Sequence, residues 1–350
     1  MRNIAYLLGA GASANAIPVI NSMPSRLREF QNVFNLIENK IRAITNLNIG
    51  NLNLNQNNYN NVLKVANILL SNTLQHSTVD TYAKKLYLAD DNENYNLLKH
   101  LLNLYLIYEQ VKTEDVEKLI HTSSSSGISK EDNNNNVKFR NFNFDTRYDV
   151  FVASILSQGP KWPDHIKIIS YNYDNQIDIA LNYYESPNNN LHLETEDLII
   201  RLNGKATPFE SHKKLDIKNI VNHLNINSFI EAFKIFYNYC NTYDQRSDPS
   251  INFSWEWNDP KKAYIKGKIS KTKQIILEAS DFVIIGYSFP EFNREVDSNI
   301  LSCVRPQTNV FIQVHPDQQK LVFERIKRFS GNRIKDNIKF VDYIEQFFIP

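Results

Sequence analysis

The chain has 350 residues and a formal net charge of +1, with 42% hydrophobic and 22% charged residues. This composition is ordinary for a globular protein, and its near neutrality gives no sign of a surface built to bind nucleic acid. Its two cysteines, Cys240 and Cys303, are too few and too far apart for a zinc ribbon or a disulfide framework. We expect a cytoplasmic protein, because no leader precedes the first apolar run and no apolar stretch approaches the roughly 18–20 residues that span a bilayer.

The first apolar run, residues 3–8, is followed at once by a glycine-rich turn made of Gly9, Ala10, Gly11, Ala12 and Ser13. A short apolar run that ends at glycine predicts a buried strand. The Gly-x-Gly-x-x-Ala spacing allows a tight turn whose backbone approaches a diphosphate. A helix beginning near Ser13 would aim its free N–H groups at the same anion. A plain strand-to-helix turn has the same residues, so the motif alone leaves both interpretations open.

Two prolines, Pro18 and Pro24, follow this turn and would end a helix early. A dehydrogenase-type nucleotide fold would continue instead with a long helix and a second strand that ends in an acidic residue. Glu29 lies at a suitable distance for that acid, but its neighbours have a helical pattern. The dehydrogenase layout therefore fits this chain poorly.

Residues 31–121 have apolar side chains at helical spacing, and we expect an all-helical insertion there. Its apolar faces are more typical of core or oligomer contacts than of a ligand site. Residues 122–145 are polar and low in complexity, which indicates a surface loop, and a helix is expected over 146–158.

Four further apolar runs each end in small or polar residues. The runs are residues 166–171, 197–202, 281–285 and 309–314, and the residues that follow them include Asn172, Asp174, Asn203, Gly204, Gly286, Tyr287, Ser288 and His315. A last strand is expected over 338–341, before a closing helix. Strands alternating with helices predict a doubly wound, mostly parallel, Rossmann-like α/β sheet with a large helical insertion. In such sheets ligands bind at the carboxyl ends of the strands.

Three of these residues have a structural explanation that stays open. Asp174 directly precedes a helical pattern and is a suitable cap for it. Asn203 and Gly204 form the dipeptide most typical of tight turns.

In this order the motifs resemble those of the sirtuin-like family. The glycine turn with Ile17 and Pro18 resembles the family's first phosphate-binding loop, and residues 170–174 resemble its Thr-x-Asn-x-Asp block. Residues 201–204 stand where the family usually has Leu-His-Gly, and residues 286–290 resemble its late Gly-x-Ser loop. His315 lies where the family contacts adenosine. The resemblance covers about residues 1–30 and 146–320, and it implies an NAD-binding core formed by residues 1–30 and 146–350.

Two departures point away from protein deacylation: the zinc-binding cysteines and the Asp-Phe-Arg after the first loop are both missing. In these respects the chain is similar to the sirtuin-like effectors of prokaryotic antiviral defence, which hydrolyse NAD to nicotinamide and ADP-ribose. The resemblance thus implies NAD as a substrate, no other cofactor and no zinc. It also implies gating by homo-oligomerisation, for which residues 31–121 are the candidates, or by a separate sensor protein. No nucleic-acid or membrane partner is expected.

A third departure concerns the catalytic histidine of the family, which is Asn203 here. By resemblance, Asn172 would hold the ribose hydroxyls or the attacking water, and Asp174 would stabilise the developing cation. Asn203 can form hydrogen bonds with ribose but cannot act as a general base. Three alternatives follow: a slow or gated hydrolase, a hydrolase in which His192, His212 or His315 substitutes, or a sensor that binds NAD or ADP-ribose without cutting it.

Overall fold

The computed structural model describes the chain in nine segments, which are residues 2–18, 22–32, 56–76, 78–111, 143–156, 161–184, 198–207, 226–242 and 250–350. Within them, six parallel strands form one sheet in the order β3-β2-β1-β4-β5-β6. The strands are β1 (Ile4–Leu8), β2 (Ile166–Ser170), β3 (Ile199–Arg201), β4 (Asp281–Ile285), β5 (Asn309–Gln313) and β6 (Ile338–Phe340).

The first strand lies at the centre of the sheet. All five residues of β1 are buried, as are all five of β4, which explains why both strands are continuous apolar runs. Leu8 lies opposite Ser170 of β2 on one side and Ile285 of β4 on the other, so the carboxyl ends of these strands are level. The chain runs outward from β1 to β3 and then crosses back to β4. This arrangement confirms the predicted doubly wound α/β fold, with its switch point between β1 and β4.

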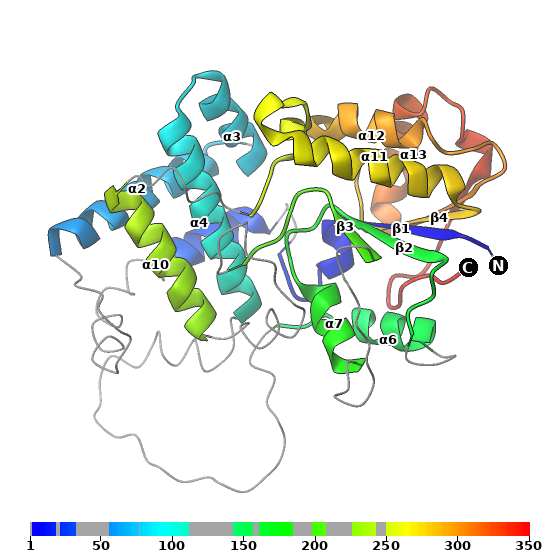
Figure 1. Ribbon diagram of the computed structural model, residues 1–350, viewed down its shortest axis with the longest axis horizontal. Coiled ribbons are helices and arrows are strands. Elements are labelled where there is room, and N and C mark those ends of the chain that lie inside the picture. Colours follow the sequence, from blue (N-terminus) through cyan, green and yellow to red (C-terminus); the bar gives the residue numbers. More distant parts are fainter. Residues whose placement is uncertain are drawn as a thin grey trace, which may run out of the picture.

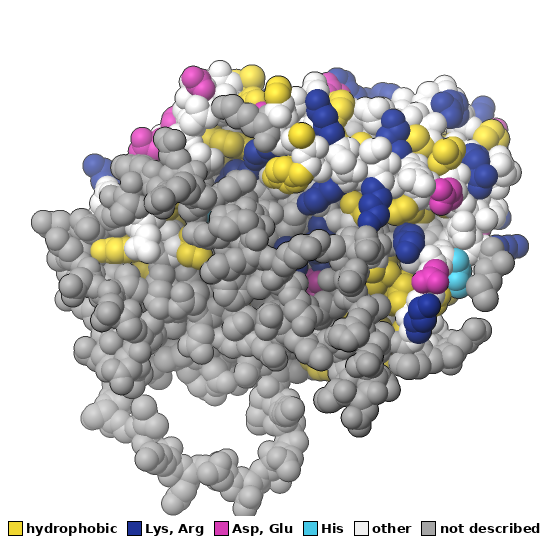
Figure 2. Space-filling view, viewed as in Figure 1, with side chains coloured by type: hydrophobic (Ala, Val, Ile, Leu, Met, Phe, Trp, Pro, Cys, Tyr) yellow, Lys and Arg dark blue, Asp and Glu magenta, His cyan; other side chains and the backbone are white. Residues whose placement is uncertain are grey.

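Helices cover both faces of the sheet (Figure 1). On one face α6 (Thr146–Ile155) and α7 (Gln176–Tyr184) pack on a core that includes Tyr6 and Ile168. On the other face lie α11 (Ala263–Glu278), α12 (Arg294–Leu301) and α13 (Pro316–Phe329). In the view of Figure 2, the lysine and arginine side chains around α11 are dispersed among hydrophobic, acidic and uncharged ones.

A separate helical body stands beside the sheet (Figure 1). It comprises residues 23–32, α2 (Gln56–Leu74), α3 (Val79–Leu88), α4 (Asn92–Val111) and α10 (Ile226–Thr242), which share one hydrophobic core. The helical pattern predicted within 31–121 is thus present in α2, α3 and α4, while 33–55, 77 and 112–121 lie outside the described residues. The helix α10, from the later part of the chain, packs against α4 and belongs to this body.

A buried ion cluster joins the helical body to the sheet domain. Glu256, in the 3₁₀ turn η3 (Ser254–Asn258), accepts hydrogen bonds from Lys99 at 3.2 and 3.3 Å and from the hydroxyl of Tyr95, both on α4. Lys262, in η4 (Pro260–Lys262), also donates to Glu256. Lys99 and Glu256 each have only 1% of their surface exposed. Burial raises the pKa of Glu256, but the two lysines outweigh it and hold this pKa below its ordinary value.

The helix predicted to begin near Ser13 is wrong. The chain instead forms a short 3₁₀ turn, η1 (Ala10–Ser13), and the N–H groups of Ala16 and Ile17 both bond to the carbonyl of Ser13. In the described residues that follow, helical structure resumes at 23–32. Pro18 limits this helix, because it has no N–H to continue the hydrogen bonding after Ile17 and it disfavours helical geometry in the residue before it.

The predicted closing helix is also wrong, since residues 341–350 are irregular. The buried side chain of Gln313 holds them, donating to the carbonyls of Tyr343 and Gln346 at 2.8 and 2.6 Å. Side-chain hydrogen bonds thus replace the backbone ladder of a helix. The helix expected over 146–158 ends at Ile155. Of the expected loop at 122–145, residues 122–142 lie outside the described residues.

No helix in the described segments has both the length and the apolar character that a membrane span requires.

Candidate functional site

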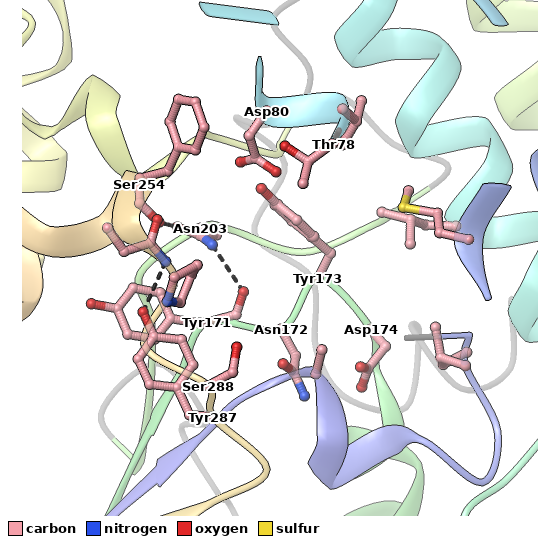
Figure 3. Close-up of a pocket in the computed structure, with 18 of the residues that line it drawn as sticks. Thr78, Asp80, Tyr171, Asn172, Tyr173, Asp174, Asn203, Ser254, Tyr287 and Ser288 are labelled. Carbon is pink, nitrogen blue, oxygen red and sulfur yellow. Dashed lines mark hydrogen bonds between the residues drawn. The ribbon is translucent and has the colours of Figure 1, made fainter. Parts of the chain in front are cut away.

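A pocket of about 200 Å³ opens at the carboxyl ends of the strands, where the sheet faces the helical body (Figure 3). Loops that follow β1, β2, β3 and β4 all contribute to its walls. The structure therefore brings together residues far apart in sequence at the switch point of the sheet, where ligands of such folds bind. The predicted site residues that line the pocket are Ala10, Ile17, Pro18, Asn172, Asp174, Asn203, Gly286, Tyr287 and Ser288.

The other predicted residues do not line the pocket. Gly9, Gly11, Ala12, Ser13 and Gly204 lie behind residues that do, and they support them by packing and hydrogen bonds. His315 caps the N-terminus of α13 with an exposed side chain and is not among the lining residues.

The glycine turn packs closely against the loop that follows β4. The N–H groups of Gly9 and Gly11 donate to the carbonyls of Ile285 and Gly286, both at 2.9 Å, so neither is available to a ligand. A side chain on Gly286, whose φ is +63°, would approach the backbone nitrogen of Ala12 to 2.2 Å. Here the glycines serve the close contact of two backbone segments, rather than exposing a row of free N–H groups.

Asn172 is oriented by the glycine turn. Its amide nitrogen donates to the carbonyl of Gly9 at 2.9 Å and lies 3.2 Å from the hydroxyl oxygen of Ser13. The Ser13 hydroxyl is itself 3.0 Å from the hydroxyl of Tyr148. Since the nitrogen is occupied, and the amide oxygen has no hydrogen bond within the described part of the chain, the oxygen is the atom that Asn172 offers to a ligand.

Asp174 caps a helix and also lines the pocket. One carboxylate oxygen accepts from the N–H of Gln176 at 3.1 Å and so caps α7, as the capping interpretation predicted. Burial raises the pKa of Asp174 above its ordinary value, although hydrogen bonds from Ser13 and Gln176 oppose this shift. A buried carboxylate with a raised pKa that faces a pocket is able to stabilise a cation or accept a proton there.

Asn203 is held at both ends of its amide. The nitrogen donates to the carbonyl of Tyr171, and the oxygen accepts from the hydroxyl of Ser254, both at 3.0 Å. A tight turn runs from Arg201 to Gly204, whose N–H donates to the carbonyl of Arg201 at 3.3 Å, so the predicted dipeptide lies at its end, and Gly204 has a φ of +76°. The amide is thus fixed in the pocket wall, with one N–H left to donate to a ligand.

One wall of the pocket is an aromatic stack. Tyr171 and Tyr287 lie parallel with their ring centroids 4.6 Å apart, and both hydroxyls donate to Asp297 of α12. Asn293 donates to the hydroxyl of Tyr287 at 2.8 Å. Burial raises the pKa of Asp297 to about 8, although its hydrogen bonds with the tyrosines oppose this. Asp297 lies behind the stack and holds it in place.

The raised pKa of Asp297 predicts a pH-dependent stability. A carboxyl group with a higher pKa in the folded than in the unfolded state favours folding when protonated, so its contribution is lost as the pH rises from about 4 to about 8. Each pH unit in this window removes up to about 1.4 kcal/mol. We expect Asp297→Asn, which removes the titration and keeps the shape, to flatten this slope. Urea denaturation across the window measures it.

An unchanged m-value at each pH shows that the same unfolding reaction is being compared. Equal pH slopes for the wild type and Asp297→Asn would contradict the expectation.

The helical body lines the opposite side of the pocket, which the sequence did not predict. Met23, Thr78, Val79, Asp80, Leu102 and Leu106 contribute there. Their spacing is that of ordinary amphipathic helices, and an acid in the first turn of α3 is typical of helix starts. No local signal therefore distinguished these residues from core positions.

Two of the alternative histidines, His192 and His212, lie outside the described residues. No histidine occurs among the described residues that line the pocket. The described segments also contain no group of three or more histidine, cysteine, aspartate or glutamate side chains placed to hold a metal ion. Comparison of the chain with models of protein families, and with curated proteins, finds no match to either.

Proposed function

We propose that this pocket binds NAD and hydrolyses the bond between its nicotinamide and its ribose. The observation that carries the proposal is the convergence of Asn172, Asp174 and Asn203 in one pocket at the switch point of a parallel sheet. These residues end two neighbouring strands, and they are the positions at which the resemblance to sirtuin-like proteins places the reaction. The fold supplies the kind of crevice in which nucleotides bind.

Hydrolysis of the nicotinamide–ribose bond needs little general acid or base catalysis. Nicotinamide is a cationic leaving group, so the bond to the ribose breaks with its electron pair going to the ring nitrogen, and the sugar gains oxocarbenium character. The carboxylate of Asp174 stabilises that charge. The free amide oxygen of Asn172 accepts a hydrogen bond from the water that attacks, and positioning supplies much of the rate. The proton that this water loses passes to Asp174 and then to solvent.

Asn203 fits this chemistry as a positioning residue. Its amide is fixed by Tyr171 and Ser254, so its remaining N–H can hold a ribose oxygen in one place. We further propose that the protein acts in a bacterial defence system and is gated by self-association or by a partner protein. Uncontrolled NAD hydrolysis would be toxic to the cell, so the activity must be held off until it is needed, and the helical body is the candidate surface for that control.

A sensor that binds NAD or ADP-ribose without cutting it is the second candidate. The observation in its favour is the absence of histidine among the described lining residues, together with the two hydrogen bonds that tie down Asn203.

The test is NAD consumption by the purified chain and by cells that express it during phage infection, followed by chromatography of the products. We expect nicotinamide and ADP-ribose in equal amounts, and a loss of about 100-fold or more in Asn172→Ala, because the water loses its acceptor. Asn299→Ala, on α12 and away from the pocket, is the matched control.

Calorimetric titration with NAD separates the two candidates. Binding without turnover in the wild type, in either setting, contradicts the hydrolase and favours the sensor. Recovery of activity in Asn203→His would identify an impaired site, and no NAD binding at all would contradict both candidates. Size-exclusion fractions are assayed in parallel, and a constitutively active monomer would contradict gating.

A further inference from the structure

The charge of the pocket is the starting observation. Apart from the tyrosines, the only ionisable side chains among the described residues that line the pocket are those of Asp80 and Asp174. No lysine or arginine is present among them. Arg201 lies nearby, but its guanidinium is engaged with Asp178 of α7. The described lining is therefore negative, and such a lining attracts cations and disfavours anions.

Asp80 approaches the pocket from the helical body (Figure 3). It belongs to the first turn of α3, whose cap is Thr78, because the Thr78 hydroxyl accepts from the N–H of Thr81 at 3.2 Å. Capping thus does not require Asp80. Its carboxylate has no hydrogen bond or ion pair with another residue in the described segments. The nearby hydroxyl of Tyr173 donates instead to the carbonyl of Asn252 at 3.0 Å.

The two aspartates lie on opposite sides of the cavity. Asp174 comes from the end of β2, and Asp80 comes from α3, with the ring of Tyr173 extending between these sides (Figure 3). Burial raises the pKa of Asp80 to about 6, so the carboxylate is mostly ionised near neutral pH. An unpaired, partly buried charge is costly, and it gains most from a ligand that brings the opposite charge.

A diphosphate does not supply that charge. It is anionic, and the N–H groups of Gly9 and Gly11 that could have bound it are already engaged. The part of a dinucleotide that matches a negative lining is its positively charged pyridinium ring. In the proposed reaction this ring carries the charge before the bond breaks and is neutral afterwards.

We propose that Asp80 is a specificity-determining residue that recognises a positively charged pyridinium ring, so that the pocket selects the oxidised, cationic nicotinamide end of its substrate. This inference rests on the proposed function and extends it to the helical body. The attraction is strongest before cleavage and falls as the electron pair moves onto the ring nitrogen. Asp80 therefore acts on binding and on release of nicotinamide, while Asp174 acts on the sugar.

The test uses two probes that contain no ribose and cannot be cleaved. N1-methylnicotinamide carries the pyridinium charge, and nicotinamide has the same ring without it. We expect the wild type to prefer the cation by about 10-fold, measured by NMR titration at a pH of about 8, because one charge pair in a partly buried site is worth about this much. Asp80→Asn keeps the size of the side chain and should reduce the preference to about 2-fold or less, with nicotinamide binding unchanged.

Glu93→Gln is the matched control, because Glu93 also lies in the first turn of a helix of the same body but is exposed and outside the pocket. It should retain the preference of the wild type. Equal binding of the two probes to the wild type, binding of neither, or an undiminished preference in Asp80→Asn would each overturn the inference.

The result of this binding test can be distinguished from the result of the test for NAD hydrolysis. If NAD is not cut but the preference for the cation depends on Asp80, the inference stands and the hydrolase fails. If NAD is cut and Asp80→Asn leaves the preference unchanged, only the inference fails. Where hydrolysis is measurable, Asp80→Asn should raise KM for NAD by up to about 10-fold and raise kcat with it, as expected for an interaction that is stronger with the substrate than with the transition state.

Discussion

Replacing Gly286 with alanine is expected to destabilise the protein by about 3 kcal/mol or more and to abolish ligand binding. The added Cβ would lie 2.2 Å from the nitrogen of Ala12 and 2.3 Å from the carbonyl carbon of Gly11. Both are backbone atoms, so no flexible side chain can move aside. The φ of +63° adds about 1–2 kcal/mol of strain for any residue with a Cβ. The loops after β1 and β4 would have to separate, and they form one wall of the pocket.

Two other glycines provide matched controls for this substitution. Gly331 has nearly the same φ, +62°, but nothing lies within 4 Å of an added Cβ, so Gly331→Ala measures the strain without the overlap. Gly267, within α11, is equally open and has no positive φ, so Gly267→Ala should be neutral or stabilising by up to about 1 kcal/mol. Chemical denaturation and NAD titration of the three variants measure these effects. Equal losses in Gly286→Ala and Gly331→Ala would contradict the close contact.

Glu256→Gln is expected to destabilise the protein by about 3–5 kcal/mol, because it leaves one buried and one partly buried cation without their shared carboxylate. Lys99 and Lys262 both donate to Glu256, whose side chain is 1% exposed. The same change should loosen the junction of the helical body with the sheet domain. Hydrogen exchange should therefore rise first in α4 and in η3, which the cluster joins. Urea denaturation gives the loss of stability.

The control is the double variant Glu256→Gln with Lys99→Met, which removes one charge of each sign. It should recover part of the lost stability, since a buried pair can often be replaced by uncharged groups at little cost.

The lowered pKa of Glu256 also predicts how the stability of the protein depends on pH. The contribution of Glu256 to the free energy of unfolding is present above the unfolded-state pKa of about 4.3 and is lost as the pH falls further, through the folded-state pKa. No change in stability or exchange in Glu256→Gln would contradict the role of the cluster.

The parallel sheet could be predicted from sequence because its strands are buried on both faces. Ile166–Ser170 and Asp281–Ile285 are apolar runs with polar residues directly after them, and parallel pairing brings those residues to one edge. Two predictions of local structure were wrong. The helix after the glycine turn is limited to a short 3₁₀ turn, because Pro18 has no N–H with which to continue it. The closing helix is absent because Gln313, far earlier in the chain, binds the backbone there.

The candidate site was predictable on the side of the sheet and not on the side of the helices. Asn172 and Asn203 stand at strand ends, and the topology alone brings such positions together. Asp80 has no such marker, since its place in the pocket depends on how α3 packs relative to the sheet. A helical pattern specifies which face of a helix is buried, but it does not specify the neighbour against which that face packs.

The central position of β1 has a consequence for synthesis on the ribosome. Ile4 pairs with Ile166 and with Asp281, so the strand emerges first and its last partner emerges about 280 residues later. At roughly 5–20 residues per second this delay is about 15–60 s. During that time a fully apolar strand remains without its final neighbours, while the helices of the body can already assemble from local contacts. We therefore expect chaperones to bind the nascent chain at the very strand on which the finished sheet is built.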